Sequence, residues 1–305
     1  MSISQQFTRR PLRSALLLSA LCAAGFTTSV QAADWSDTYI GYRMGSKFAE
    51  PFGSNDIGKD ILNLNHVSGY KYGTNFFNVD MLISDNKDPA SKGSTNGAQE
   101  VYVVYRNTLD LEKATGTSFK FGPVRGLGLT GGFDLNTKDD AGYNSKKRML
   151  VLGPTAMFDV PGFLNVSLLW LQESNAPYNG FTGVSTPRYS YKGHPMLTAA
   201  WSIPVSKDYP ITFEGFANFI ASKGENESTP PKAKGTAPET NIDMQLMYDV
   251  SSLYGKKGTF KVGIEYQYWK NKFGNKTTPD LNPGLGHAGP GATAKTPMIR
   301  AEYHF

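Results

Sequence analysis

The sequence has little cysteine, little charge and no long apolar run. One cysteine among 305 residues excludes a scaffold held by disulfides. Charged residues make up 19%, below the roughly 25% usual in a soluble domain. The apolar run at 15–26 is shorter than the roughly 18 residues that a membrane-spanning helix needs, which excludes a bundle of such helices. Glycine (32 residues) and aromatic residues (12%) are plentiful instead, and this aromatic content argues against a disordered chain.

Residues 1–32 are organised like a secretory signal peptide. Arg9, Arg10 and Arg13 precede the apolar run, and Val30-Gln31-Ala32 fits the recognition site of signal peptidase, so we expect cleavage near Ala32. Loss of this segment removes three arginines and no acid, so the net charge falls from +5 to +2. The basic charge therefore belongs partly to the export signal, and no nucleic-acid partner is expected. Residues 33–305 form the mature domain.

In the mature domain apolar residues recur at every second position, which is the period of a β-strand. Residues 240–250 are typical: Ile242, Met244 and Leu246 lie on one face, and Asn241 and Asp243 on the other. About twelve such segments are expected, most of them 10–12 residues long: 38–48, 61–70, 75–84, 98–109, 119–136, 148–159, 163–172, 195–205, 211–222, 240–250, 259–272 and 296–305.

The connections between these segments alternate between short turns and long polar loops. A tilted membrane strand needs about 9–11 residues, and short turns on one rim with long loops on the other are typical of outer-membrane barrels. A soluble β-sandwich does not require this alternation. The sequence therefore predicts an all-β fold, a transmembrane antiparallel up-and-down β-barrel of about 12 strands, in the outer membrane of a Gram-negative bacterium.

The last strand ends in an alternating apolar face: Ile299, Ala301, Tyr303 and Phe305. A terminal aromatic residue with another two positions before it resembles the signature of bacterial outer-membrane barrels. We interpret Tyr303 and Phe305 as an assembly signal for the barrel-assembly machinery. Outer-membrane lipids and lipopolysaccharide are the expected surroundings of the barrel.

Motifs for enzymatic chemistry are weak. Residues 126–131 match G-x-G-x-x-G, but the sequence continues as a strand and residue 151 is valine, where a dinucleotide site needs an acid. We interpret these as strand glycines whose missing side chains leave room in the lumen. The four histidines are scattered, and there is no G-x-S-x-G motif. We expect no enzyme, no metal and no cofactor.

The inward faces of the strands provide the candidate site. Ionisable groups could bind solute hydroxyls and base edges, and aromatic faces could stack on rings, although charges of both signs also pair across any such lumen for structural reasons. The main substrate-binding candidates are Tyr39, Arg43, Asp80, Tyr102, Arg106, Glu214, Phe216, Asp243, Glu265, Trp269 and Arg300. The same faces carry Lys47, Asn78, Glu100, Asn218, Gln245, Gln267 and Glu302.

Two stretches carry a family resemblance. Residues 105–123, with Tyr-Arg-Asn-Thr-Leu-Asp before a turn and Phe-Gly-Pro after it, resemble the Tsx-type nucleoside-specific channels, as do residues 60–80, a hairpin that ends in Asp80. Tyr268-Trp269 is a weaker match. The resemblance implies a twelve-stranded monomeric barrel that takes up nucleosides passively. It places Asp80, Arg106, Phe121, Gly122 and Pro123 on motif positions, whereas loops 173–194, 223–239 and 273–295 depart from the family.

The leading hypothesis is a channel for passive, selective uptake of nucleosides or similar small polar solutes. A general porin-like diffusion pore is the alternative. A blocked barrel that serves as a receptor or adhesin scaffold, and an outer-membrane hydrolase, are further alternatives.

Overall fold

The computed structural model describes residues 33–224 and 235–305, and the compact unit it forms spans Asp34–Phe305. The predicted signal peptide lies outside the described residues. No helix in the described part of the chain is long and apolar enough to cross a membrane.

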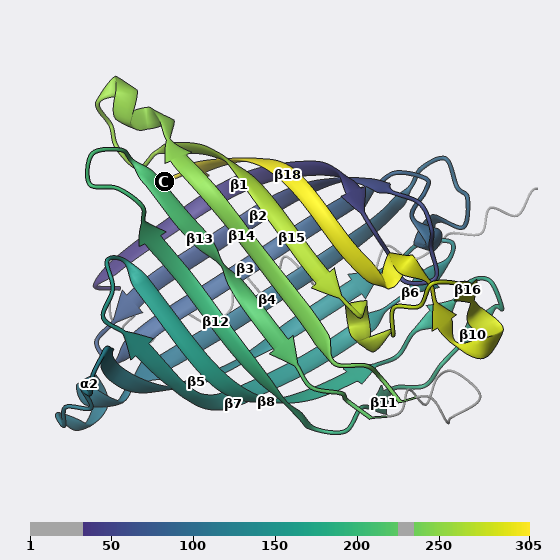
Figure 1. Ribbon diagram of the computed structural model, residues 1–305, viewed down its shortest axis with the longest axis horizontal. Coiled ribbons are helices and arrows are strands. Elements are labelled where there is room, and N and C mark those ends of the chain that lie inside the picture. Colours follow the sequence, from purple (N-terminus) through teal and green to yellow (C-terminus); the bar gives the residue numbers. More distant parts are fainter. Residues whose placement is uncertain (1–32, 225–234) are drawn as a thin grey trace, which may run out of the picture. The chain divides into compact units, whose positions relative to one another are not determined.

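Long antiparallel strands make up most of the described chain (Figure 1). Each of the predicted segments overlaps one of them, which confirms the prediction of strands from the period of two. Within residues 33–224 and 235–305 the twelve long strands are β1 (Trp35–Phe48), β2 (Ile57–Tyr70), β3 (Gly73–Ser84), β4 (Ala98–Asp110), β5 (Val124–Lys138), β7 (Lys146–Phe158), β8 (Phe163–Asn175), β12 (His194–Pro204), β13 (Ile211–Ile220), β14 (Glu239–Asp249), β15 (Phe260–Lys270) and β18 (Thr293–His304).

One predicted boundary is wrong. The segment 119–136 does not begin as a strand, because the chain turns at Gly122 (φ +52°) and β5 starts at Val124. The helix α2 (Leu111–Thr115) fills the preceding turn. Asp110 caps it by accepting hydrogen bonds from the backbone N–H groups of residues 112 and 113, and Gly116 ends it at φ +75°.

The sheet closes on itself. Each long strand pairs with its neighbours in the chain, and β1 pairs with β18 from Tyr39↔His304 to Met44↔Ile299. Closure leaves no long strand with an unpaired edge, so the backbone hydrogen bonds of the wall are satisfied without water. The fold is therefore a closed antiparallel up-and-down barrel, as predicted.

The wall is apolar outside and polar inside, the reverse of a soluble protein. Outward side chains such as Leu150, Ile264 and Ile299 are 60–64% exposed, whereas Glu265 and Glu302 are about 2% and 1% exposed. Alternation along each strand produces this arrangement, because neighbouring residues point to opposite faces.

Short turns join the strands at one end of the barrel and long loops at the other (Figure 1). The long loops contain short elements: η1 (Pro89–Ser91), β6 (Tyr143–Asn144), β9 (Tyr178–Asn179), β10 (Val184–Ser185), β11 (Tyr189–Ser190), η3 (Lys272–Gly274), β16 (Leu281–Asn282), η4 (Pro283–Leu285), β17 (His287–Ala288) and η5 (Pro290–Ala292). The helix η2 (Val250–Tyr254) lies in the turn between β14 and β15.

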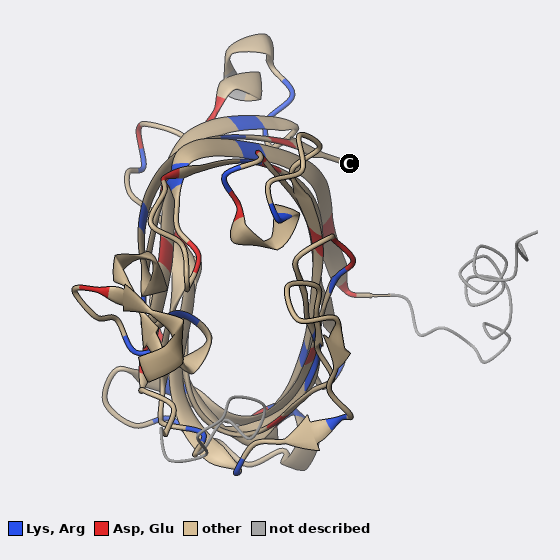
Figure 2. Ribbon diagram, turned by 90° about the vertical axis from the view of Figure 1, so that its right-hand side faces the viewer, with Lys and Arg blue, Asp and Glu red and all other residues tan. Residues whose placement is uncertain are grey.

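Several long loops interlock at the long-loop end of the barrel, and Figure 2 shows some of them reaching inside the outline of the wall. Backbone hydrogen bonds join Phe52 N to Ala288 O (2.9 Å), Gly142 N to Ala90 O (2.7 Å) and Gly180 N to Gly142 O (2.6 Å). Gly291 packs so closely that an added Cβ would lie 2.2 Å from a backbone oxygen of Gly53. We name these segments, residues 49–53, 89–92, 141–142, 179–181 and 288–292, the lid.

Candidate functional site

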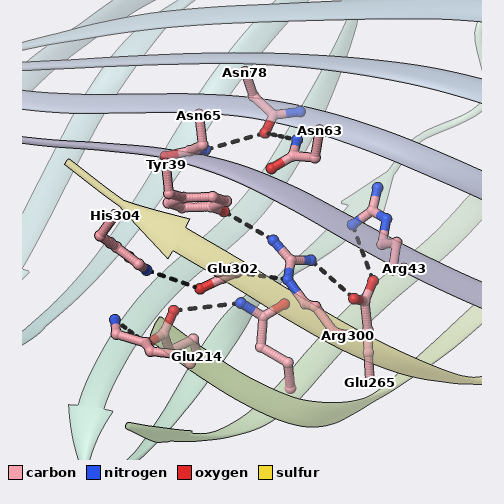
Figure 3. Close-up of polar contacts among 12 residues, drawn as sticks. Tyr39, Arg43, Asn63, Asn65, Asn78, Glu214, Glu265, Arg300, Glu302 and His304 are labelled. Carbon is pink, nitrogen blue, oxygen red and sulfur yellow. Dashed lines mark hydrogen bonds and ion pairs between the residues drawn. The ribbon is translucent and has the colours of Figure 1, made fainter. Parts of the chain in front are cut away.

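Two arginines on neighbouring strands organise the centre of the lumen (Figure 3). Arg43 of β1 donates to Asp80 of β3 (2.6 Å) and to Glu265 of β15 (3.0 Å). Arg300 of β18 donates to the other oxygen of Glu265 (2.8 Å). Four predicted residues are thus brought together in one ionic cluster that links β3 to β15 across the inner face.

The cluster continues toward the short-turn end. Arg300 also donates to Glu302 (2.6 Å) and to the Tyr39 hydroxyl (2.8 Å). The His304 ring lies against Tyr39, with centroids 4.9 Å apart, and its two nitrogens face Glu302 (3.2 Å) and Asp37 (2.8 Å). Each ionised group of this cluster has a partner of opposite charge, as charges held at low exposure require.

A second cluster lies on β4 and β5. Asp134 accepts hydrogen bonds from Arg106 (2.5 Å) and from the Tyr102 hydroxyl (2.8 Å). Gly132 allows this arrangement: a Cβ there would lie 3.0 Å from Arg106 Cδ and 2.0 Å from the Tyr105 carbonyl oxygen. Close approach of neighbouring groups thus explains Gly132.

The remaining predicted residues lie on β13–β15. Glu214 accepts from Gln245 (3.3 Å) and lies 3.8 Å from the Lys261 ammonium, and Asp243 accepts from Gln267 (3.1 Å). Phe216 is half-buried and lies opposite Asp243 in the register. Trp269 donates to Glu239 (3.3 Å) and packs edge-on against Phe273, with ring centroids 4.8 Å apart.

Lys47 does not face the lumen as the alternation predicts. The register shifts between Gly45 and Phe48, a β-bulge that reverses the inward parity. Phe48 is buried instead, and the Lys47 side chain is 58% exposed and pairs with Asp56 (2.7 Å).

Two further ionic clusters near the long loops were missed by the sequence reasoning. In the first, Glu50 accepts from Lys59 (2.6 Å) and Lys272 (2.9 Å), and Asp88 lies 3.3 Å from Lys59. Burial raises the pKa of Glu50, but the ammonium groups of Lys138, Lys272 and Lys59 outweigh it and hold that pKa well below its ordinary value of 4.5. Glu50, Asp88 and Lys272 lie in loops, where strand alternation predicts nothing.

The second missed cluster centres on Lys223. Its ammonium lies 2.9 Å from Glu173 and 3.3 Å from Glu239, and Glu173 also pairs with Lys147 (3.3 Å). Lys223, like Glu50, is almost fully buried. Neither cluster has a sequence signal beyond scattered lysines and glutamates.

Part of the inner wall is apolar. Val151, Leu169, Leu171 and Met196, from β7, β8 and β12, form a buried cluster with Met149 and Ile220 against it. The charged groups of β1, β3, β15 and β18 lie on other strands of the wall. The lumen therefore presents both apolar and hydrogen-bonding surfaces.

Both residues of the predicted assembly signal point away from the lumen. Tyr303 is 53% and Phe305 is 70% exposed, and the Phe305 backbone donates to Thr38 O (3.0 Å). Within residues 33–224 and 235–305, no group of three or more His, Cys, Asp or Glu side chains could hold a metal ion.

A closed barrel with an apolar exterior and a paired, polar interior defines a transmembrane β-barrel of the outer-membrane class. No protein-family model and no curated protein matches the chain. Among solved structures it is similar to the KdgM porin, with 13% identity over 88% of this chain and 99% of that one and a TM-score of 0.41.

The translocator domain of the autotransporter NalP from Neisseria meningitidis gives 12% identity over 95% of this chain and 92% of that one, with a TM-score of 0.43. The outer membrane protein OpdK from Pseudomonas aeruginosa gives 10% identity over 90% of this chain and 99% of that one, with a TM-score of 0.27. These similarities are too remote to indicate a function, which depends on the residues of the lumen.

Proposed function

We propose that this protein is a monomeric outer-membrane channel for the passive, selective uptake of nucleosides or similar small polar solutes. The central cluster carries the proposal. Arg43 and Asp80 pair with each other and are each 14% exposed at the side chain, and Arg106, which pairs with Asp134 in the second cluster, is 19% exposed, so these groups still face space in the lumen. Several weak sites of this kind permit selective passage without trapping.

The chemistry of the lumen favours uncharged ring compounds. Acids and bases are paired at short range, so neither cations nor anions gain a continuous favourable path. Amide, hydroxyl and charged groups supply hydrogen bonds for a sugar or a base edge, and Tyr39, Tyr102 and Phe216 supply faces for stacking. The resemblance to the nucleoside channels points the same way. We propose that lipopolysaccharide and lipids surround the barrel and that the assembly machinery inserts it.

Uptake into liposomes tests the proposal. Radiolabelled nucleosides should enter faster than sugars and amino acids of similar mass. Rates that depend on mass alone would overturn selectivity in favour of a general diffusion pore. Planar bilayers that show no conductance steps would identify a blocked barrel.

A further inference from the structure

A short segment after β15 has an unusual backbone. Residues 271–275, here called the strap, include Asn271 (φ +53°), Phe273 (φ +61°) and Gly274 (φ +81°). Non-glycine residues rarely adopt this left-handed conformation, and it persists only where the surroundings enforce it.

Hydrogen bonds to neighbouring segments hold the strap in this conformation. Lys272 donates to Glu50 (2.9 Å) and to the carbonyl oxygen of Ala49 (3.0 Å). The Phe273 backbone N–H donates to Glu239 (3.0 Å), and the Asn271 side chain donates to the carbonyl oxygen of Pro238 (2.8 Å). The strap is thus tied both to the lid and to the end of β14.

One side chain of the strap contacts the opposite wall of the barrel. The Phe273 ring centroid lies 4.3 Å from Lys147 Nζ, and 5.2 Å from Lys272 Nζ. Lys147 belongs to β7, whereas the strap follows β15. In the described barrel, β14, β13, β12 and β8 separate these strands in one direction, and β18 and β1–β5 in the other. The two strands therefore lie on nearly opposite sides, and the contact bridges the interior.

We propose that Phe273 is the residue that determines solute selectivity in this channel, and that it binds a planar heterocyclic ring by stacking. The Lys147 ammonium holds the ring by a cation–π contact while no solute is present. The Lys147 side chain keeps 16% exposure and its ammonium also pairs with Glu173 (3.3 Å), so it can stay with Glu173 and leave its place over the ring to the solute. Exchange of one favourable contact for another keeps binding weak enough for release. The identity of the solute rests on the proposed function, whereas the contact between Phe273 of the strap and Lys147 does not.

Two substitutions of Phe273 separate the effect of side-chain volume from the effect of stacking. Phe273→Ala removes both, so the single-channel conductance in potassium chloride should rise. Phe273→Leu keeps most of the bulk, so conductance should stay close to that of the wild type, whereas reduction of the current by added adenosine should need about tenfold more adenosine, as expected for loss of one base–aromatic stack. Tyr72→Ala is the matched control: Lys71 lies over this ring too (4.9 Å), but Tyr72 lies in the short turn between β2 and β3, outside the lid and the strap.

Lys147→Met gives a prediction of opposite sign and leaves the strap intact. It removes the group that competes for the ring, so adenosine should reduce the current at lower concentration. Heat-resistant migration on gels verifies that each variant is folded.

The results distinguish this inference from the proposed function. If adenosine blocks the wild-type channel, but Phe273→Ala and Phe273→Leu both match Tyr72→Ala, the role of Phe273 is overturned and the proposed function stands. If no nucleoside affects the wild-type current while Phe273→Ala raises the conductance, both nucleoside uptake and stacking at Phe273 are refuted. Only the conclusion that Phe273 narrows the lumen then remains.

Discussion

Glu50 is the residue through which the lid should be most sensitive to substitution. Its carboxylate neutralises Lys59 and Lys272, and all three side chains are 2–5% exposed. Glu50→Gln keeps the size and removes the charge. Removal of one partner from a buried ion pair costs about 3–5 kcal/mol. Lys59 retains Asp88 at 3.3 Å, so the lower end applies.

A loss of about 3 kcal/mol corresponds to a change of about 100-fold in the ratio of closed to open lid, since about 1.4 kcal/mol is a factor of ten. The fraction of time that single channels spend open in planar bilayers measures this ratio. Proteolysis of the long loops in liposomes provides an independent measurement. An open fraction and a cleavage rate equal to those of the wild type would refute the assigned role of Glu50.

The ion pairs of Glu50 with Lys59 and Lys272 also predict a response to pH. Because the folded-state pKa of Glu50 is lowered, its stabilising contribution is complete above the ordinary pKa of 4.5 and is lost as the pH falls through the lower folded value. Asp88 responds in the same direction: burial raises its pKa, but Lys59 contributes to lowering it below 3.8. Acidification below pH 4.5 should open the wild-type lid, and Glu50→Gln should respond less.

Three other changes, two substitutions and one deletion, test the wall and its assembly. Gly132→Val places a Cβ 2.0 Å from a carbonyl oxygen and should destabilise the barrel by about 1–3 kcal/mol in urea unfolding, whereas Gly131→Ala, whose Cβ would be 3.5 Å from its nearest neighbour, should be mild; equal midpoints would contradict the close approach. Arg43→Gln leaves Asp80 without this ion pair, so the reversal potential in a salt gradient should shift toward cation selectivity, and an unchanged potential would argue against lumen exposure of Asp80. Deletion of Phe305 should lower the yield of heat-resistant barrel more than the uptake rate per folded molecule; normal assembly would remove its role as a signal.

The strand count, the closed barrel and the direction of most side chains could be predicted because one local rule, alternation, governs every strand. The rule gave Arg43, Asp80, Glu265 and Arg300 as lumen residues from widely separated segments, and the structure joins them in one cluster. It failed at Lys47, where a single β-bulge reverses the parity. A bulge leaves no reliable trace in a short sequence window.

Composition and alternation by themselves thus determined that this chain forms an outer-membrane-type barrel with a polar interior. Only the tertiary structure decided how the long loops are placed. Loop conformation depends on contacts between residues far apart in the chain, such as Glu50 with Lys272 and Lys147 with Phe273, and no local pattern encodes them. Because those contacts join the long loops to distant parts of the wall, the features that we propose to select a solute belong to the tertiary structure.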